Sequence, residues 1–266
     1  MDIKPIEHSD INTLTELQPE GWPNIVPYFE FYCSSDFCFP IKVIEENKII
    51  GIGTTIIHND VAWLAHIIVH PESRKKGIGQ LITQTLVDST EENRIETVYL
   101  IATDLGAPVY TKLGFETETE YLFFKNLSFE QNLTVHKNIA PFGEEHRDQI
   151  QKIDRKVSGE ERVFHIENYF PNAYVYCEGK NVEGYYLPTF GEGLIIATTA
   201  SAGVELMKFR LRSNEHAVFP VDNLYATTFL YQNNYKEIKT AKRMRLGKER
   251  TVQLQNIYNR IGGNLG

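Results

Sequence analysis

The chain has 266 residues, 42% of them hydrophobic, and a formal net charge of -8. These totals predict a globular protein with one large or two medium domains, and they argue against nucleic acid or an anionic membrane as the main partner. Cys33, Cys38 and Cys177 lack metal-ligand spacing, so neither a disulfide framework nor a zinc site is predicted. Without a signal-like start or a membrane-length apolar run, we expect a cytoplasmic protein.

The first forty residues predict a strand and two helices. Residues 3–6 form the expected strand, and Ser9-Asp10 offers an N-cap for a helix that ends at Leu17. The aromatic segment at residues 28–32 predicts the second helix. Most of its rings are expected to pack into the core.

An antiparallel meander is predicted next. Residues 41–57 form a hairpin, and a strand over residues 61–69 follows. Strict alternation would place one set of its side chains on a shared face, namely Val61, Trp63, Ala65, Ile67 and Val69. His66 is then expected on the opposite face, as a hydrogen-bonded core histidine.

A basic, glycine-spaced loop joins this strand to a helix. The loop contains Arg74-Lys75-Lys76, and helical periodicity begins at Ile78. Gly77 and Gly79 allow several backbone N–H groups to approach one anion at the positive end of the helix. Neither a P-loop nor a dinucleotide fingerprint fits the spacing. The loop therefore predicts a pyrophosphate site.

Two motifs in this order resemble the GNAT superfamily of N-acetyltransferases. Arg74-x-x-Gly77-x-Gly79 is similar to the family's acetyl-CoA motif, Arg/Gln-x-x-Gly-x-Gly/Ala. Downstream, a strand over residues 97–103 precedes a short helix whose sequence, Tyr110 to Phe115, resembles the family's Tyr-x-x-Leu-Gly-Phe signature. The resemblance implies an α+β fold with a mixed sheet, and a GNAT domain over residues 1–127 that ends with a strand at residues 121–125.

The resemblance also implies an activity, the transfer of an acetyl group from acetyl-CoA to a primary amine. The pantetheine arm of the donor would pair with the backbone of Ile67, Ile68 and Val69. Its pyrophosphate would lie on the amides of Arg74, Lys75, Lys76, Gly77, Ile78, Gly79 and Gln80. Further donor contacts are expected at Thr103, Ala107 and Tyr110. Tyr110 is also the expected general acid that protonates the departing thiolate, and no metal is expected.

The general base stays open at this stage. Family members with a base on the cofactor strand place it near Trp63 or Ala65, and neither side chain can accept a proton. The remaining options are His58, Asp60 or Glu30 through a water, and the C-terminal carboxylate. A non-catalytic acyl-CoA sensor or scaffold is therefore the second hypothesis, and a nucleic-acid-binding module is a third that the net charge disfavours.

Beyond a polar linker at residues 128–137, the pattern of the first half begins again. Residues 194–196 align with residues 67–69, and the predicted elements around them follow in the same order. We therefore predict two tandem GNAT-like domains, the second at residues 138–266.

The second copy is predicted to be degenerate and silent. Its loop, residues 197–203, has no basic residue and a single glycine, and the position of Tyr110 falls near Leu230, with Tyr231 beside it. His165, Glu160 and Glu161 could reach the substrate cleft from the second domain, but a charged helix end that faces solvent is the preferred expectation.

The acceptor is expected to be a small-molecule or peptide amine, such as a polyamine, an aminoglycoside, a lysine or an N-terminal amine. No nucleic acid and no membrane are expected as partners. A homodimer stays open.

Overall fold

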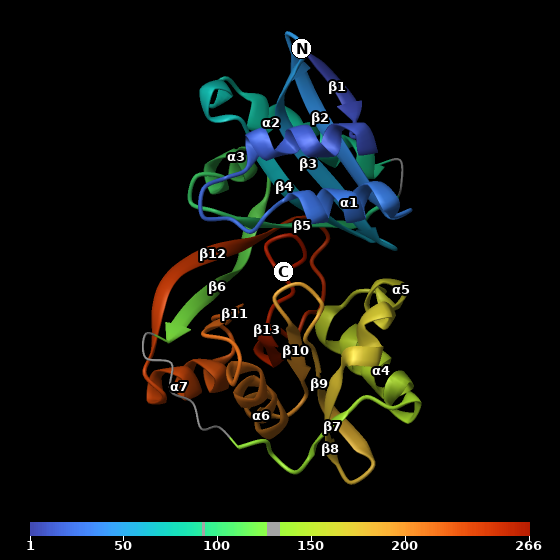
Figure 1. The fold of residues 1–266 in the computed structure, drawn as a ribbon, viewed down its shortest axis with the longest axis vertical. Helices are drawn as coiled ribbons and strands as arrows, with labels where there is room; N and C mark the ends of the chain where they lie inside the picture. Colours follow the sequence, from blue (N-terminus) through green and yellow to red (C-terminus); the bar gives the residue numbers. More distant parts are fainter. Residues whose placement is uncertain (92–93, 127–133) are drawn as a thin grey trace. The chain divides into compact units, whose positions relative to one another are not determined.

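A computed structural model describes residues 1–91, 94–126 and 134–266 of the protein (Figure 1). The chain divides into two compact units. Unit 1 comprises Met1–Glu116 and Met244–Lys248, and unit 2 comprises Thr117–Arg243 and Glu249–Gly266. Most of the linker expected at residues 128–137 lies outside the described residues. The linear boundaries expected from the sequence stay a prediction.

Unit 1 holds the first half of the elements. In chain order they are β1 (Asp2–Pro5), the 3-10 helix η1 (His8–Leu17), α1 (Val26–Ser34), β2 (Cys38–Glu45), β3 (Lys48–His58), β4 (Val61–Val69), the 3-10 turn η2 (Pro71–Ser73), α2 (Ile78–Glu91), β5 (Thr97–Ala102) and α3 (Ala107–Lys112). Strands β1 to β4 pair antiparallel in sequence order, and β5 then pairs parallel to β4. The predicted meander is confirmed.

The first helix differs in type from the prediction. Its buried residues Ile11, Leu14 and Leu17 recur every three positions, which matches the 3.0-residue turn of a 3-10 helix better than an α-helix. The N-cap is Glu7 rather than Ser9 or Asp10. Asp10 instead accepts a hydrogen bond from the Glu7 N–H at 2.8 Å, so its carboxylate closes the first turn from inside the helix.

A β-bulge interrupts β4 and changes which side chains share a face. Thr54 pairs with Ala65 and Ile52 with Ile68, so one residue of β3 lies opposite two of β4. As a result Ile67 and Val69 pack in the α2-side core together with the even-numbered residues of β4 before the bulge, Ala62 and Leu64. The prediction that Ile67 and Val69 share a face with Trp63 is therefore wrong.

Unit 2 holds the remaining elements. They are β6 (Glu116–Asn126, whose first residue belongs to unit 1), β7 (Ile139–Pro141), η3 (Glu144–His146), α4 (Arg147–Ser158), α5 (Val163–Ile166), η4 (Glu167–Asn172), β8 (Tyr174–Glu178), β9 (Asn181–Leu187), β10 (Leu194–Ala197), α6 (Ala200–Leu211), β11 (His216–Pro220), α7 (Leu224–Gln232), β12 (Tyr235–Gly247, which ends in unit 1), η5 (Leu254–Asn256) and β13 (Ile257–Asn259).

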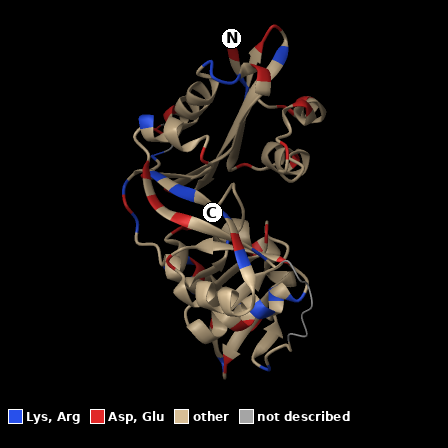
Figure 2. Cartoon of the chain, turned by 90° about the vertical axis from the view of Figure 1, so that its left-hand side faces the viewer, with Lys and Arg blue, Asp and Glu red and all other residues tan. Residues whose placement is uncertain are grey.

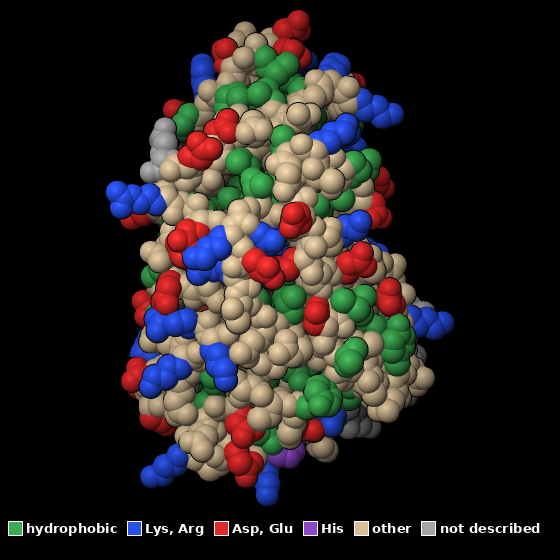
Figure 3. Space-filling model, turned by 180° about the vertical axis from the view of Figure 1, so that it is seen from behind, with side chains coloured by type: hydrophobic (Ala, Val, Ile, Leu, Met, Phe, Trp, Pro, Cys, Tyr) green, Lys and Arg blue, Asp and Glu red, His purple; other side chains and the backbone are tan. Residues whose placement is uncertain are grey.

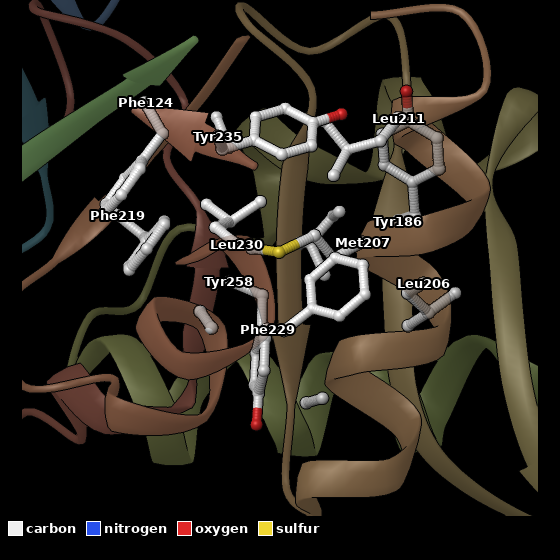
Figure 4. Packing of buried hydrophobic residues seen from close by; sticks show 14 of the residues in the cluster. Phe124, Tyr186, Leu206, Met207, Leu211, Phe219, Phe229, Leu230, Tyr235 and Tyr258 are labelled. Atoms are coloured by element: carbon white, nitrogen blue, oxygen red, sulfur yellow. The ribbon is translucent and has the colours of Figure 1, made fainter. Parts of the chain in front are cut away.

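The sheets of unit 2 combine segments that are distant in sequence. One sheet has the order β13-β10-β9-β8-β7, and β11 pairs antiparallel with β6. The strand expected at residues 121–125 lies in β6 and contributes to unit 2, because it pairs with His216–Pro220. Figure 4 shows the core where these elements meet, with the rings of Phe124 and Phe219 stacked at 5.6 Å between centroids.

The chain from the end of α4 into α5 is largely buried, whereas the prediction placed it at a solvent-facing helix end. Glu160 and His165 are each 2% exposed. They lie beside a buried ion pair in which Arg162 donates to both oxygens of Asp154 at 3.0 and 2.9 Å. This network explains why charged residues are tolerated inside the unit, since buried charges need partners.

The described residues contain no helix that is long and apolar enough to cross a membrane. Cys33, Cys38 and Cys177 are free thiols. No group of three His, Cys, Asp or Glu side chains in the described ranges is arranged to hold a metal ion.

Candidate active site

The strands β4 and β5 diverge at the centre of unit 1. Their parallel pairing covers only Val61–Leu64 against Thr97–Leu100. β4 continues to Val69 and keeps its partner β3 on the other edge, where Val69 pairs with Gly51. Among the described residues no strand pairs with the β5-side edge of Ile67–Val69. This edge offers backbone hydrogen-bonding groups to a ligand.

Two glycines of β3 bring α2 against the sheet. A Cβ at Gly51 or at Gly53 would lie 2.7 Å from an atom of Ile82, and at Gly53 also 2.9 Å from Leu86 Cδ1. Because no side chain intervenes, α2 packs directly on the backbone of β3. The N-terminus of α2 is thereby held at the end of β4.

The loop before α2 is suited to an anion. Gly77 has φ of +82° and no atom within 4 Å of a Cβ built on it, and Lys75 has φ of +63°. Arg74 Nε donates to Val69 O at 3.2 Å and ties the loop to β4. Within the described chain, the N–H groups of residues 75–80 have no hydrogen-bond acceptor. These N–H groups and three adjacent cationic side chains occupy the positive end of α2.

Not every residue of the predicted motif has a packing role. Gly79 meets only Val69 Cγ2, at the ordinary contact distance of 3.7 Å, so the fold itself has room for a Cβ there. Gln80 is exposed, whereas Ile78 is 2% exposed and anchors the helix in the core. Ile78 therefore anchors the helix in the core, whereas the rest of the loop forms a solvent-facing, cationic surface.

Tyr110 lies on α3, where its ring is buried and its hydroxyl is unpaired in the described part of the chain. The residue is 9% exposed, and its ring contacts Phe115 edge-on at 6.1 Å. Burial raises the pKa of Tyr110 to about 12. The phenol is therefore protonated at neutral pH, as a proton donor must be. Thr103 O accepts from the N–H groups of Gly106 and Ala107, at 3.0 and 2.9 Å, and starts α3.

One hydrophobic cluster joins the separate parts of the expected donor site. Ala107 and Tyr110 of α3 belong to it, together with Ile78 of α2, and Ile67 and Val69 of β4 pack against it. The fold thus brings the two sequence motifs into one region. Thr103 is exposed just before α3.

His66 lies at the β4 bulge and contacts α1, not α2. Its φ is +48°, and its Nδ1 is 2.9 Å from the hydroxyl of Tyr32. The ring lies 4.8 Å from that of Tyr28 and 5.8 Å from that of Phe29. Burial lowers the pKa of His66 to about 4. The prediction of a hydrogen-bonded histidine is confirmed, but not its face, because the bulge reverses the alternation.

A surface hollow of about 500 Å³ borders this aromatic group. It is lined by Thr15, Gln18, Pro19, Glu20, Gly21, Trp22 and Asn24. Gln18 holds the lining loop, because its Nε2 donates to the carbonyls of Pro19, Trp22 and Pro23 and its Oε1 accepts from the Ile25 N–H. The indole of Trp22 lies 6.3 Å from the ring of His66, so the hollow and His66 are neighbours.

Three other base candidates lie outside β4. His58 is fully buried at the end of β3, with its ring 6.3 Å from that of Phe37. Glu30 is exposed on α1. The C-terminal residue Gly266 belongs to unit 2, where its carbonyl oxygen accepts from the Ile261 N–H at 2.9 Å. The pair formed by Tyr32 and His66 was not foreseen, since nothing in the alternating pattern of β4 signals a bulge.

Comparison with known proteins identifies the fold. Residues 35–117 match the family model described as an acetyltransferase (GNAT) domain. No curated protein matches the chain.

Several solved structures share the architecture. A proposed acetyltransferase from Pyrococcus horikoshii superposes with a TM-score of 0.84 at 18% identity, covering 100% of this chain and 95% of its own. A GCN5-related N-acetyltransferase from Anabaena variabilis has a TM-score of 0.59 at 12% identity, with 92% and 72% covered. A tandem GNAT protein from the clavulanic acid biosynthesis pathway has a TM-score of 0.62 at 11% identity, with 92% and 98% covered. These likenesses concern the fold.

Proposed function

Because the chain contains a GNAT acetyltransferase domain at residues 35–117, and so is an acyl transferase, we propose that it moves an acetyl group from acetyl-CoA to a primary amine, with the active site in unit 1. The observation that carries this proposal is the open edge of Ile67–Val69 leading into the unpaired N–H groups of residues 75–80. A long donor with a hydrogen-bonding arm and a pyrophosphate matches both features.

In this proposal the donor contacts lie at the open strand edge and at the loop before α2. The backbone of Ile67, Ile68 and Val69 pairs with the pantetheine arm, and residues 74–80 hold the pyrophosphate. Thr103 and Ala107 border the donor at the start of α3. Tyr110, protonated because of its burial, gives its proton to the departing thiolate.

The tandem arrangement is part of the proposal, with the second copy silent. In unit 2 the counterpart of β4 is β10, and the chain itself occupies its edge. Ile257–Asn259 of β13 pairs with Ile195 and Ile196 of β10. β13 also reaches β11, because Asn259 Oδ1 accepts from the Val218 N–H at 3.0 Å. A protein strand therefore fills the place that unit 1 leaves open between β4 and β5, and this supports the absence of a donor site.

The start of α6 supports the same conclusion. Thr199 caps this helix by accepting from the Ala202 N–H, and its hydroxyl donates to the carboxylate of Glu183 at 2.8 Å. A carboxylate at a helix N-terminus already uses the favourable positive potential there, and it repels a second anion. The loop also lacks the three cationic residues of unit 1.

The amine acceptor and the location complete the proposal. Acidic and basic side chains are interspersed along the chain (Figure 2), and the face in Figure 3 likewise carries both signs side by side. With a net charge of -8, this distribution disfavours nucleic acid and favours a cationic amine, free or on a peptide. The three free thiols are consistent with a cytoplasmic location.

The test is thiol release from acetyl-CoA across a panel of small amines and amine-bearing peptides, corrected for hydrolysis. Gly77→Glu places a carboxylate in the proposed pyrophosphate site. Gly179→Glu is the matched control, because Gly179 also has positive φ and nothing within 4 Å of a Cβ. Amine-dependent release that the Gly77 variant loses and the Gly179 variant keeps is the expected result. Donor binding without release for any amine would favour the acyl-CoA sensor, and no donor binding would refute both.

A further inference from the structure

We propose that His66 is the proton acceptor for the amine substrate and that Tyr32 is the positioning residue that orients its imidazole. This inference rests on the proposed function, since it assigns the base of the same reaction. Sequence analysis left that base open, because no residue on the expected face of the strand can accept a proton.

The backbone at His66 is the first observation. A non-glycine residue with φ of +48° inside a strand is uncommon and strained. The strain occurs where the parallel pairing of β4 with β5 has ended at Leu64 and just before the open edge of Ile67–Val69. The bulge thus turns the side chain of His66 toward α1 at the point where the donor edge begins.

The surroundings of the imidazole are the second observation. Tyr32, itself 1% exposed, places its hydroxyl 2.9 Å from Nδ1. The rings of Tyr28 and Phe29 pack on the same imidazole, and Trp22 approaches it from the loop beside the hollow. Among the described residues, Tyr28 and Tyr32 are the titratable groups in contact with the ring, so its position is fixed without a neighbouring charge there.

The other ring nitrogen is available. Nε2 has no hydrogen-bond partner in the described ranges, and it is not among their enclosed, unpaired polar atoms. When Nδ1–H donates to the oxygen of Tyr32, Nε2 carries the lone pair. A neutral imidazole held in this tautomer has its acceptor at the ring nitrogen that no described protein group occupies.

The reaction balances with these groups. The acceptor attacks the thioester carbon as the free amine, and the C–N bond forms. Nε2 takes the proton that the positively charged nitrogen of the tetrahedral intermediate then loses, because this nitrogen is more acidic than a free ammonium ion. The C–S bond breaks and the thiolate takes the Tyr110 proton, while the proton on His66 restores Tyr110 through solvent. The products are an amide and a free thiol.

The central test compares His66→Gln with His136→Gln. His136 is a matched control in unit 2, because it is also part-buried, stacks on a tyrosine, Tyr176, and is hydrogen-bonded at Nδ1. We expect His66→Gln to lower kcat at neutral pH by about 10²-fold or more, with KM for acetyl-CoA unchanged. The loss should persist at high pH, because the nitrogen must lose this proton after attack even when the acceptor is already a free amine. The His136 variant should keep the wild-type rate and profile.

Two further measurements keep the inference falsifiable if His66→Gln does not fold. Tyr32→Phe should lower kcat about tenfold without changing KM for acetyl-CoA, and nitrogen-15 NMR of the wild-type imidazole should show protonated Nδ1 and bare Nε2. An unchanged rate in either variant, or the opposite tautomer, would overturn the inference while transfer by the wild type stood. Wild-type protein that binds acetyl-CoA but acetylates no amine would overturn the proposed function, and this inference with it.

Discussion

Gly106 and Tyr110 lie so close that a Cβ on Gly106 would stand 2.8 Å from Tyr110 Cε2. Because Gly106 has no side chain, the ring of Tyr110 can pack against the backbone there. Phe115 contacts the ring edge-on. The hydroxyl is held in a fixed position without a hydrogen bond in the described chain, which suits a group that donates its proton to a substrate.

Tyr110→Phe tests this role. It should lower kcat by about 10²-fold and leave the Kd for acetyl-CoA unchanged, because the ring stays and only the proton donor is lost. Since burial raises the pKa of Tyr110 to about 12, the wild-type rate should not fall through loss of this proton below pH 10. Tyr231→Phe is the control, because Tyr231 is 54% exposed and lies next to the counterpart of Tyr110. Equal rates for both variants would refute the assignment.

The partly buried His66 predicts an acid-dependent stability. The pKa of His66 is lowered from 6.5 to about 4 in the folded protein. Between pH 6.5 and pH 4 the unfolded chain therefore binds a proton at His66 that the folded protein does not bind. The free energy of unfolding should therefore fall by about 3 kcal/mol between pH 6.5 and pH 4. Tryptophan fluorescence during urea unfolding reports this for unit 1, because Trp22 and Trp63 both lie there. His66→Gln should remove that part of the pH dependence, and an unchanged slope would contradict the prediction.

Gln18 is expected to control the acceptor side. Gln18→Ala removes the donor to three carbonyls and the acceptor for the Ile25 N–H, at a cost of about 2 kcal/mol. The loop that lines the hollow should loosen, so KM for the amine should rise several-fold while the Kd for acetyl-CoA stays constant. Steady-state kinetics with either substrate varied gives both values. An unchanged KM for the amine would exclude this loop from the acceptor site.

Asn259 is expected to stabilise unit 2 without affecting catalysis. Its side chain accepts from the Val218 N–H and donates to the carbonyls of Glu192 and Gly193, and it is 1% exposed. Asn259→Leu leaves these buried groups unsatisfied and should cost about 3 kcal/mol. Hydrogen exchange should show faster opening of β11 and β13, with the Kd for acetyl-CoA unchanged. A weaker Kd would mean that unit 2 contributes to donor binding.

The sequence predicted the elements that depend on local pattern. The hairpin at residues 41–57, the strand over residues 61–69 and the helix from Ile78 follow from periodicity and turn residues, and the structure confirms them. The two motifs also predict that the loop before α2 lies in one region with α3. A family resemblance implies a shared fold, and a fold specifies contacts between distant segments, which periodicity does not.

The remaining features depend on long-range pairing. The bulge at His66 leaves the hydrophobic alternation of β4 intact in sequence, so the reversal of faces is visible only against the register of β3. β13 is three residues long and has no periodicity to detect, and its place beside β10 is set by contacts made by Asn259. The partnership of Tyr32 with His66 likewise joins residues far apart in the chain.

Hydrogen exchange with and without acetyl-CoA tests the central claim most directly, because it locates the donor on the chain without an identified amine. We predict that acetyl-CoA slows exchange at Ile67–Val69 and at residues 75–80 of unit 1, and leaves residues 194–203 of unit 2 unchanged. Gly179→Glu should give the same pattern as the wild type, and Gly77→Glu should abolish it. Protection absent from residues 75–80, or centred on unit 2, would contradict the claim.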